Sequence, residues 1–359
     1  MVNIKSLIIL CCVCITSCNS DKNMPSERLR TVLNQCARNG QTLLGHQDDI
    51  AYGTKWTSER YRSDIHDVTG TYPALMGWDL GRLEYLSETN IDNVPFRTIS
   101  EGVHFTDSLG GINTFSWHAN NPVDDTDSWS VGQQVVSEIL PGGSYHAKFM
   151  GWLSHMADYL LTLRNSNGEL IPLIFRPWHE HNGDWFWWGK KWCSPQEYKE
   201  LWIMTYEYFS SRGLNNLLWA YSPSPGSGKE DYMERFPGKE YVDLLGLDIY
   251  QGADDVEGTH YSEQLHRALG DMESIGKELN LPIAITETGL ERIPDSDWWT
   301  TVLLPAIESY PVTYVMVWRN AYDRPNHYYA PFPGQASEED FLKFVSLPKV
   351  KMIKDMKKQ

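Results

Sequence analysis

Short apolar runs recur along this chain, and longer stretches with helical spacing separate them. Eight β-branched and apolar runs lie at residues 43–47, 74–79, 112–118, 173–180, 217–222, 244–250, 283–288 and 312–319. Amphipathic segments lie between them, for example at residues 144–164, 195–212 and 261–279. Strands that alternate with helices in this way predict βαβ units and therefore a parallel sheet.

Eight strand–helix units fit a closed (β/α)8 barrel, or TIM barrel, better than an open doubly wound sheet. No run leads into the Gly-x-Gly-x-x-Gly turn with which a Rossmann-type sheet binds a dinucleotide. Residues 26–359 contain no internal repeat, low-complexity block or Pro/Ser-rich linker. We therefore predict an α/β protein with a single (β/α)8 barrel domain over residues 26–359.

The first eighteen residues have a different character. Lys5 is followed by an apolar run from Leu7 to Ile15, and the segment ends in small residues before Cys18. A basic start and an apolar run too short to span a bilayer are typical of a secretory signal. The end of the segment resembles a bacterial lipoprotein signal, so we expect residues 1–17 to be a signal peptide and residues 18–25 a tether. Ordinary secretion with cleavage nearby is the alternative.

We expect this protein to contact the membrane only through a lipid anchor at Cys18. The residues after Cys18 include no strong acidic run, and this favours the periplasmic face of an exported lipoprotein over the cell surface. After Cys18 only Cys36 and Cys193 remain. In an oxidising compartment these two cysteines could form a disulfide with each other.

Composition narrows the class of partner. The chain has 359 residues, 41% of them hydrophobic, and a formal net charge of −16. This charge repels nucleic acid and anionic membrane surfaces, whereas neutral polymers do not respond to it. The 15 Trp and 19 Tyr offer flat apolar faces with polar edges, which suit the C–H faces of pyranose rings. We expect about half of these aromatic residues simply to fill the core.

Polar and aromatic residues stand at the ends of the predicted strands, where the active sites of such barrels form. They are Gln47, Asp79, His118, Glu180, Tyr250, Glu287 and Arg319. The two glutamates end the fourth and seventh runs and are predicted to face one cleft. Cleavage of a glycosidic bond uses two carboxyl groups: one protonates the leaving oxygen, and the other attacks or stabilises the sugar cation.

The surroundings of the two glutamates suggest which group plays which part. Glu180 is close in sequence to Trp178, Trp185, Trp187 and Trp188, and apolar neighbours favour the protonated form that a proton donor needs.

Glu287 stands between Thr286 and Thr288, a more polar setting that suits an ionised carboxylate. Tyr250 is expected to orient Glu287 by donating its phenolic hydrogen bond.

Other hydrolase chemistries have weaker support. The zinc motif His-Glu-x-x-His would need a histidine where this chain has Gly183, although His179 and His181 leave a metal-assisted hydrolase open. No Gly-x-Ser-x-Gly elbow is present for a serine nucleophile. Since no calcium loop or cofactor motif is present, we expect neither a metal nor a cofactor.

With this arrangement the chain resembles glycoside hydrolase family 26 over nearly everything after the tether. The motifs that carry the resemblance are RPWHEHNGDWFWWG at 176–189, GLDIY at 246–250, ITETG at 285–289 and VMVWRN at 315–320, with GHQ at 45–47 and SWH at 116–118. The family consists mostly of endo-acting β-1,4-mannanases. It also contains β-1,3-xylanases, mixed-linkage β-glucanases and enzymes that release mannobiose from chain ends.

The resemblance implies roles for individual residues. It makes Glu180 the general acid/base and Glu287 the nucleophile of a retaining mechanism, with the carboxyl groups roughly 5–5.5 Å apart. Tyr250 would hold the nucleophile and Trp318 would lie under the sugar at the cleavage point.

The resemblance also implies contacts beyond the cleavage point. His118, Asp243 and Arg319 would contact the glycone sugars, and Trp185 would pack beside the acid on the aglycone side. His179 stands where the wider clan has Asn, close to the sugar 2-OH.

Family frequency favours mannan or manno-oligosaccharides as the substrate, with β-1,3-xylan or mixed-linkage glucan as alternatives. Long loops are predicted at residues 80–95, 119–143 and 320–341. We expect these loops to wall off the glycone end and to favour mannobiose as the product. A glycan-binding lipoprotein without activity is the non-catalytic alternative.

Overall fold

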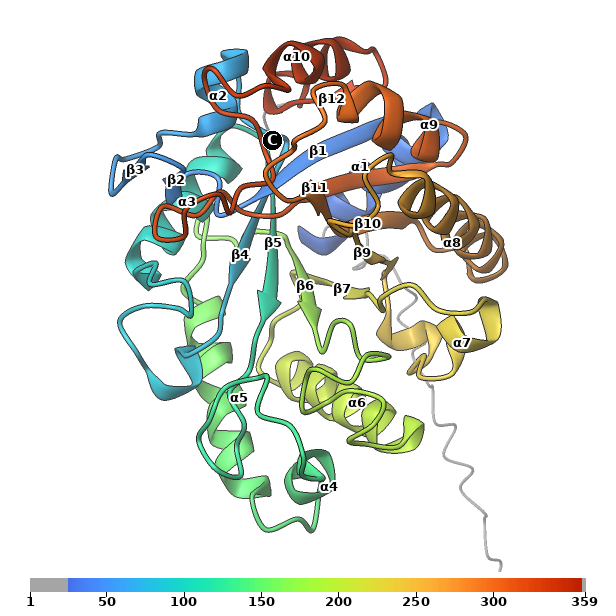
Figure 1. Ribbon diagram of the computed structural model, residues 1–359. Helices are drawn as coiled ribbons and strands as arrows, with labels where there is room; N and C mark the ends of the chain where they lie inside the picture. The colour runs from blue at the N-terminus through green and yellow to red at the C-terminus, as the bar shows by residue number, and fades with distance from the viewer. Residues whose placement is uncertain (1–24, 357–359) are drawn as a thin grey trace, which may run out of the picture.

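The apolar runs form the strands of a closed parallel barrel in the computed structural model, which describes residues 25–356 (Figure 1). This confirms the predicted (β/α)8 fold. The barrel strands are β1 (Thr42–Gln47), β4 (Leu75–Asp79), β5 (Ile112–Trp117), β6 (Leu173–Pro177), β7 (Leu217–Tyr221), β8 (Leu244–Leu245), β9 (Asp248–Gln251), β10 (Ile283–Leu290) and β11 (Val312–Val317).

Parallel pairing runs around the barrel and closes between its first and last strands. Leu43 of β1 pairs with Tyr314 of β11, and Gly45 of the same strand pairs with Leu75 of β4. The predicted sixth strand is divided into β8 and β9, which both pair with β10. Three short strands lie outside the ring: β2 (Tyr52–Gly53), β3 (Trp56–Thr57) and β12 (Val350–Lys351).

Helices connect consecutive strands and cover the outside of the barrel (Figure 1). They are α1 (Pro25–Asn39), α2 (Asp64–Thr69), α3 (Phe96–Ser108), α4 (Val135–Ile139), α5 (His146–Leu160), α6 (Pro195–Ser211), α7 (Lys229–Met233), α8 (Thr259–Leu279), α9 (Leu304–Ile307) and α10 (Glu338–Ser346). Short 3-10 turns lie at Leu83–Tyr85, Lys239–Tyr241 and Ile353–Asp355, and a π-helical turn lies at Trp299–Leu303. The three amphipathic segments singled out in the sequence correspond to α5, α6 and α8.

The start of α6 shows how the sequence fixes these helices. Ser194 caps the helix by accepting from the backbone N–H of Glu197, and the Glu197 carboxylate accepts from the backbone N–H of Ser194. Pro195 occupies the first turn, where its missing N–H costs nothing. This capping box sets the beginning of the helix that follows the loop after β6.

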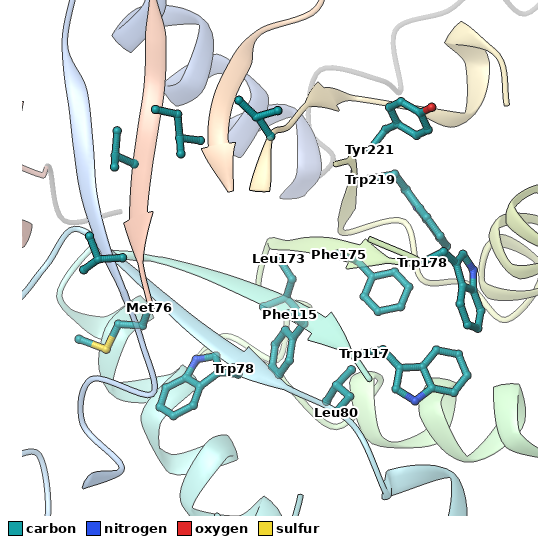
Figure 2. Packing of buried hydrophobic residues seen from close by; sticks show 14 of the residues in the cluster. Met76, Trp78, Leu80, Phe115, Trp117, Leu173, Phe175, Trp178, Trp219 and Tyr221 are labelled. Carbon is teal, nitrogen blue, oxygen red and sulfur yellow. The ribbon is translucent and has the colours of Figure 1, made fainter. Parts of the chain in front are cut away.

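Aromatic residues fill the layer between the strands and the helices. Phe115, Trp117, Phe175 and Trp178 lie close together there, and Figure 2 shows them side by side. Eleven of the 15 Trp residues and six of the 19 Tyr residues are buried, so packing accounts for about half of them, as the sequence suggested. Replacing one such buried aromatic residue by alanine typically costs about 3–5 kcal/mol.

Helix α1 lies across the N-terminal ends of the strands. Its Leu29 and Leu33 join a second apolar cluster with Leu75, Leu218 and Ala284. This end of the barrel is therefore closed by packing. The three predicted long loops leave β4, β5 and β11 at the opposite, C-terminal ends of the strands.

Cys36 and Cys193 are both buried and free, so they form no disulfide with each other. Within residues 25–356, no helix is both long and apolar enough to cross a membrane. The predicted signal peptide, Cys18 and nearly all of the tether lie outside the described residues.

Candidate active site

Glu180 stands on a strained turn just beyond β6. The predicted run reached Glu180, but the strand ends at Pro177, and the backbone of Trp178 and Glu180 turns left-handed with φ of 53° and 51°. The backbone N–H of Glu180 donates a 2.8 Å hydrogen bond to the carbonyl oxygen of Ser222. Strained backbone held in this way is typical of functional sites, because the surrounding contacts fix where the side chain points.

The environment of the Glu180 carboxyl group favours the protonated acid. Burial and the nearby charge of Glu287 together raise the pKa of Glu180 to about 7. The indole N–H of Trp185 donates a 2.7 Å hydrogen bond to Oε2 of Glu180 and opposes this rise. A carboxylic acid with such a pKa can give up a proton near neutral pH and take it back.

The other tryptophans near Glu180 in the sequence have a structural role. Trp178, Trp187 and Trp188 are fully buried and pack edge to face on one another. Trp188 donates its indole N–H to the carbonyl oxygen of His179. They support the loop after β6, whereas Trp185 is 40% exposed beside the acid.

Glu287 lies within β10 and is held by two donors on its two oxygens. The guanidinium of Arg176 donates to Oε1, and the phenol of Tyr250 donates to Oε2 at 2.7 Å. The side chain stays buried at 4% exposure, so these donors replace the solvation that an ionised carboxylate needs. The predicted Tyr250–Glu287 contact is therefore present.

Thr286 and Thr288, which the sequence suggested as polar neighbours of Glu287, bond elsewhere. Thr286 donates to Asp248 at 2.6 Å, and the Thr288 hydroxyl lies 2.6 Å from the phenol of Tyr261.

Arg176 is one of the site residues that the sequence did not predict. It is fully buried on β6 and bridges Glu287 and Asp248, whose Oδ2 lies 2.8 Å from Nη1. These two carboxylates outweigh desolvation and raise the pKa of Arg176. An arginine inside an apolar run was the available signal, since a buried cation needs anionic partners.

His118 follows β5 and lies between Asp79 and His179. Its Nδ1 lies 2.7 Å from Oδ2 of Asp79, and its Nε2 lies 3.3 Å from Nε2 of His179. Burial opposes charge on the ring, but Asp79 outweighs it and raises the pKa of His118. Burial lowers the pKa of His179 well below its usual range. The arrangement therefore pairs a readily protonated imidazole with a neutral one.

Aromatic rings extend the site beside His118. Trp318 is half-buried, with its ring centroid 6.4 Å from that of His118. Trp129, on the loop after β5, stacks on His118 at 5.2 Å and is 48% exposed. No sequence pattern distinguished Trp129 from the other loop residues. Exposed rings of this kind suit the apolar faces of sugars.

Arg319 follows Trp318 and is fixed by loops after two other strands. Its Nη2 lies 3.0 Å from Oδ1 of Asp92, and its Nη1 donates to the Tyr52 hydroxyl at 3.1 Å. Tyr52 in turn donates to Asp48 at 2.6 Å. This network holds Arg319 at the same end of the barrel as His118.

The predicted place of Asp243 is wrong. Asp243 directly precedes β8, at the N-terminal end of the barrel, and its carboxylate accepts from Arg30 of α1 at 2.7 Å. It also accepts from the backbone N–H of Trp219 at 2.8 Å. Because the chain crosses the barrel between positions 243 and 248, Asp248 is the acidic residue of this segment that reaches the site.

His179 and His181 do not share a face. His179 packs against His118 and Phe186, whereas the ring of His181 lies between Tyr198 and Tyr221. Among residues 25–356, no group of three or more His, Cys, Asp or Glu side chains is arranged to hold a metal ion.

Comparison with known proteins places this site in a family. The sequence model of glycosyl hydrolase family 26 matches residues 18–324. The chain belongs to glycosyl hydrolase family 26. Among solved family 26 structures, a β-mannanase from Bacteroides ovatus, BoMan26A, is 46% identical with a TM-score of 0.89. The match covers 92% of this chain and 95% of that one.

Curated relatives of this family 26 chain carry the name mannan endo-1,4-beta-mannosidase. The protein from Bifidobacterium adolescentis is 31% identical over 90% of this chain. This chain covers 34% of that relative's length. The Bacillus subtilis protein is also 31% identical, over 71% of this chain and 68% of its own length.

Proposed function

We propose that this protein is a retaining β-mannanase that hydrolyses β-1,4-mannosidic linkages in mannan, galactomannan or manno-oligosaccharides. The observation that carries the proposal is the contrast between the two glutamates. Burial and the charge of Glu287 raise the pKa of Glu180, whereas Arg176 and Tyr250 donate hydrogen bonds to the two oxygens of Glu287. Carboxyl groups with such different environments are suited to acid and nucleophile.

In the first step, Glu287 attacks the anomeric carbon while the bond to the leaving sugar breaks. Glu180 transfers its proton to the leaving oxygen, so the departing sugar leaves as an alcohol. Arg176 and Tyr250 each occupy one oxygen of Glu287 and so fix its orientation for attack. The result is a sugar bound to Glu287 through an ester and a deprotonated Glu180.

In the second step, Glu180 takes a proton from a water molecule, and the resulting hydroxide attacks the anomeric carbon. The ester bond to Glu287 breaks, which restores the free carboxylate, and Glu180 is again protonated. Two inversions at the same carbon give net retention. A pKa near 7 serves Glu180 in both steps, because it gives and accepts a proton at similar cost.

Mannan is the substrate that the relatives support. The Bacteroides ovatus structure is described as a β-mannanase, and the Bifidobacterium adolescentis and Bacillus subtilis relatives are named for β-1,4-mannan cleavage. Side-by-side assays on mannan, β-1,3-xylan and mixed-linkage glucan test this assignment. We expect reducing sugar from mannan only, and none from the Glu287→Ala variant. Cleavage of xylan or mixed-linkage glucan in preference to mannan would overturn it.

We propose further that the enzyme releases mannobiose from chain ends. The long loops after β4, β5 and β11 all lie at the catalytic end of the barrel, and Arg319 is tied to the first of them through Asp92. Loops in this position build the active site of a barrel enzyme and shape access to it. A time course on mannohexaose should show an excess of disaccharide from the earliest points. An even spread of oligomers would contradict chain-end action.

We also propose that Cys18 carries a lipid anchor on an exported, periplasm-facing protein. The support is the Lys5-led apolar segment that ends at Cys18. In the native host, wild-type protein should incorporate labelled palmitate, and a Cys18→Ala variant should not. Protease added to intact cells should spare the anchored protein. Digestion under those conditions would place it on the cell surface instead.

A further inference from the structure

A cavity of about 460 Å³ lies at the catalytic end of the barrel, outside the site described above. The loop after β1 forms one wall with residues 50–52 and 57–61. Residues 93–95, from the loop after β4, and the first turns of α3 form a second wall, and Tyr322, beyond β11, lines it as well. The volume is within the range of small-molecule sites, roughly 300–1,000 Å³.

The lining suits a neutral, hydroxylated ligand. Three aromatic rings contribute, from Tyr52, Tyr61 and Tyr322, and hydroxyl groups come from Thr57, Ser58 and Thr98. Aromatic faces pack against C–H groups, while hydroxyl groups both donate and accept hydrogen bonds. This mixture matches the two kinds of surface on a sugar ring.

The charges around the cavity balance one another. Arg60 and Arg97 face Glu101, with N–O distances of 3.7 and 3.6 Å, and Glu59 supplies the second negative charge. Two cations and two anions create no net field that would select a charged ligand.

The backbone around the cavity is strained at three positions. Ser58, Tyr61 and Asn93 adopt φ of 60°, 60° and 61°, although none is glycine, and all three line the cavity. Trp178 and Glu180 at the catalytic turn have the same kind of strain. Such conformations persist where the surrounding structure holds them, and they are frequent at functional sites.

Tyr52 links the cavity to the site already described. Its ring lines the cavity and lies 5.3 Å from the ring of Tyr322, while its hydroxyl accepts from Arg319. Only 2% of Tyr52 is exposed, so its side chain separates the cavity from the active site. A ligand in the cavity therefore sits directly behind the residue that positions Arg319.

We propose that this cavity is a second saccharide site, which binds a short segment of the same neutral glycan that the enzyme cleaves. It rests on the proposed mannanase function, because the ligand named is mannan. The glycan would pack on Tyr322 and bond to Thr98 and Asn93. The site would hold the polymer beside the cleft without touching the reacting atoms.

Two variants change the cavity and a third serves as the matched control. Tyr322→Ala removes a ring that is 38% exposed, and Thr98→Trp fills the space from α3. Tyr310→Ala removes a partly exposed ring that packs on His266 of α8, in the turn before β11 at the opposite end of the barrel. Each is made in the Glu287→Ala background for binding and in the wild-type background for kinetics.

Affinity electrophoresis in gels containing mannan measures binding to the polymer. Both cavity variants should bind about fivefold more weakly, the equivalent of about 1 kcal/mol for one lost aromatic contact. The Tyr310→Ala control should bind as tightly as its parent. In the active enzyme, the cavity variants should raise KM on mannan more than KM on mannotetraose, with kcat preserved.

If both cavity variants bind mannan as tightly as the control while the wild type cleaves mannan, the second site is refuted and the proposed function stands. If the wild type does not cleave mannan at all, the proposed function itself fails. Thermal unfolding of each variant shows whether a loss of mannan binding comes from misfolding. Tyr322→Ala keeps the test decisive if Thr98→Trp does not fold.

Discussion

The phenolic oxygen of Tyr250 lies 2.7 Å from Oε2 of Glu287, and Arg176 donates to the other oxygen of the same carboxylate. Both oxygens of Glu287 are therefore occupied by donors inside a buried site. Burial alone favours a neutral carboxylic acid, as it does for Glu180. The hydrogen bonds from Arg176 and Tyr250 therefore give Glu287 a different environment from that of Glu180, although both residues are glutamates.

Arg176→Met should abolish most activity. Removing the cation leaves Glu287 and Asp248 buried without a positive partner, a loss of about 3–5 kcal/mol in comparable buried pairs. We expect kcat to fall by at least about 10²-fold. Arg176→Lys restores the charge without the two-pronged geometry and should recover only part of the rate. Full activity of Arg176→Met would contradict the role of this network.

The alkaline limb of kcat/KM should report Glu180. This group must be protonated for the first step, so the rate should decline as pH rises through about 7. Trp185→Phe removes a hydrogen bond that lowers the pKa of Glu180, so the limb should shift to higher pH. Initial rates between pH 5 and pH 9 measure both effects. An unchanged or lowered limb in Trp185→Phe would argue against this assignment.

Replacing Asp243 by Asn should lower stability but not activity, whereas replacing Asp248 by Asn should lower activity. Asp243 bonds to Arg30 and Trp219 far from the cleft, so its loss should lower the free energy of unfolding by about 1–3 kcal/mol. Its kcat/KM should stay close to that of the wild type. Asp248→Asn weakens the support of Arg176 and should lower kcat roughly tenfold or more, which corresponds to about 1.4 kcal/mol. Denaturant unfolding and mannan kinetics on both variants check this contrast.

Asp79 and His118 should act as one unit. Asp79 fixes the His118 ring through Nδ1, so Asp79→Asn and His118→Ala should impair the same sugar contact that is expected of His118. Each should reduce kcat/KM by roughly tenfold, or about 1.4 kcal/mol, and the double variant should be little worse than the poorer single one. Strictly additive losses in this cycle would show that the two residues act independently.

The barrel and the two catalytic strands were predictable because they depend on periodicity. Apolar runs at regular spacing specify strands, and parallel strands bring their C-terminal ends to one face. The pattern does not show where a strand stops. The run that contains Arg176 continues apolar to Trp178, yet the strand ends at Pro177 and a left-handed turn carries Glu180.

The misplacement of Asp243 has the same origin. Asp243 and Asp248 flank one short apolar run, and one lies at each end of the barrel. Proximity in sequence to Tyr250 gave no information about which end each would reach. Arg176, Asp248 and Trp129 were missed because their importance depends on partners from β10, β6 and β5 that only the folded chain brings together.

Labelling of the nucleophile tests the central claim most directly. A 2-deoxy-2-fluoro-β-mannobioside with an activated leaving group slows the second step and traps the sugar on the enzyme. Mass spectrometry of the digested protein should place one sugar on the peptide that contains Glu287, and Glu287→Ala should remain unlabelled. A label on Glu180 or on any other residue, or turnover with inversion and no label, would contradict the account.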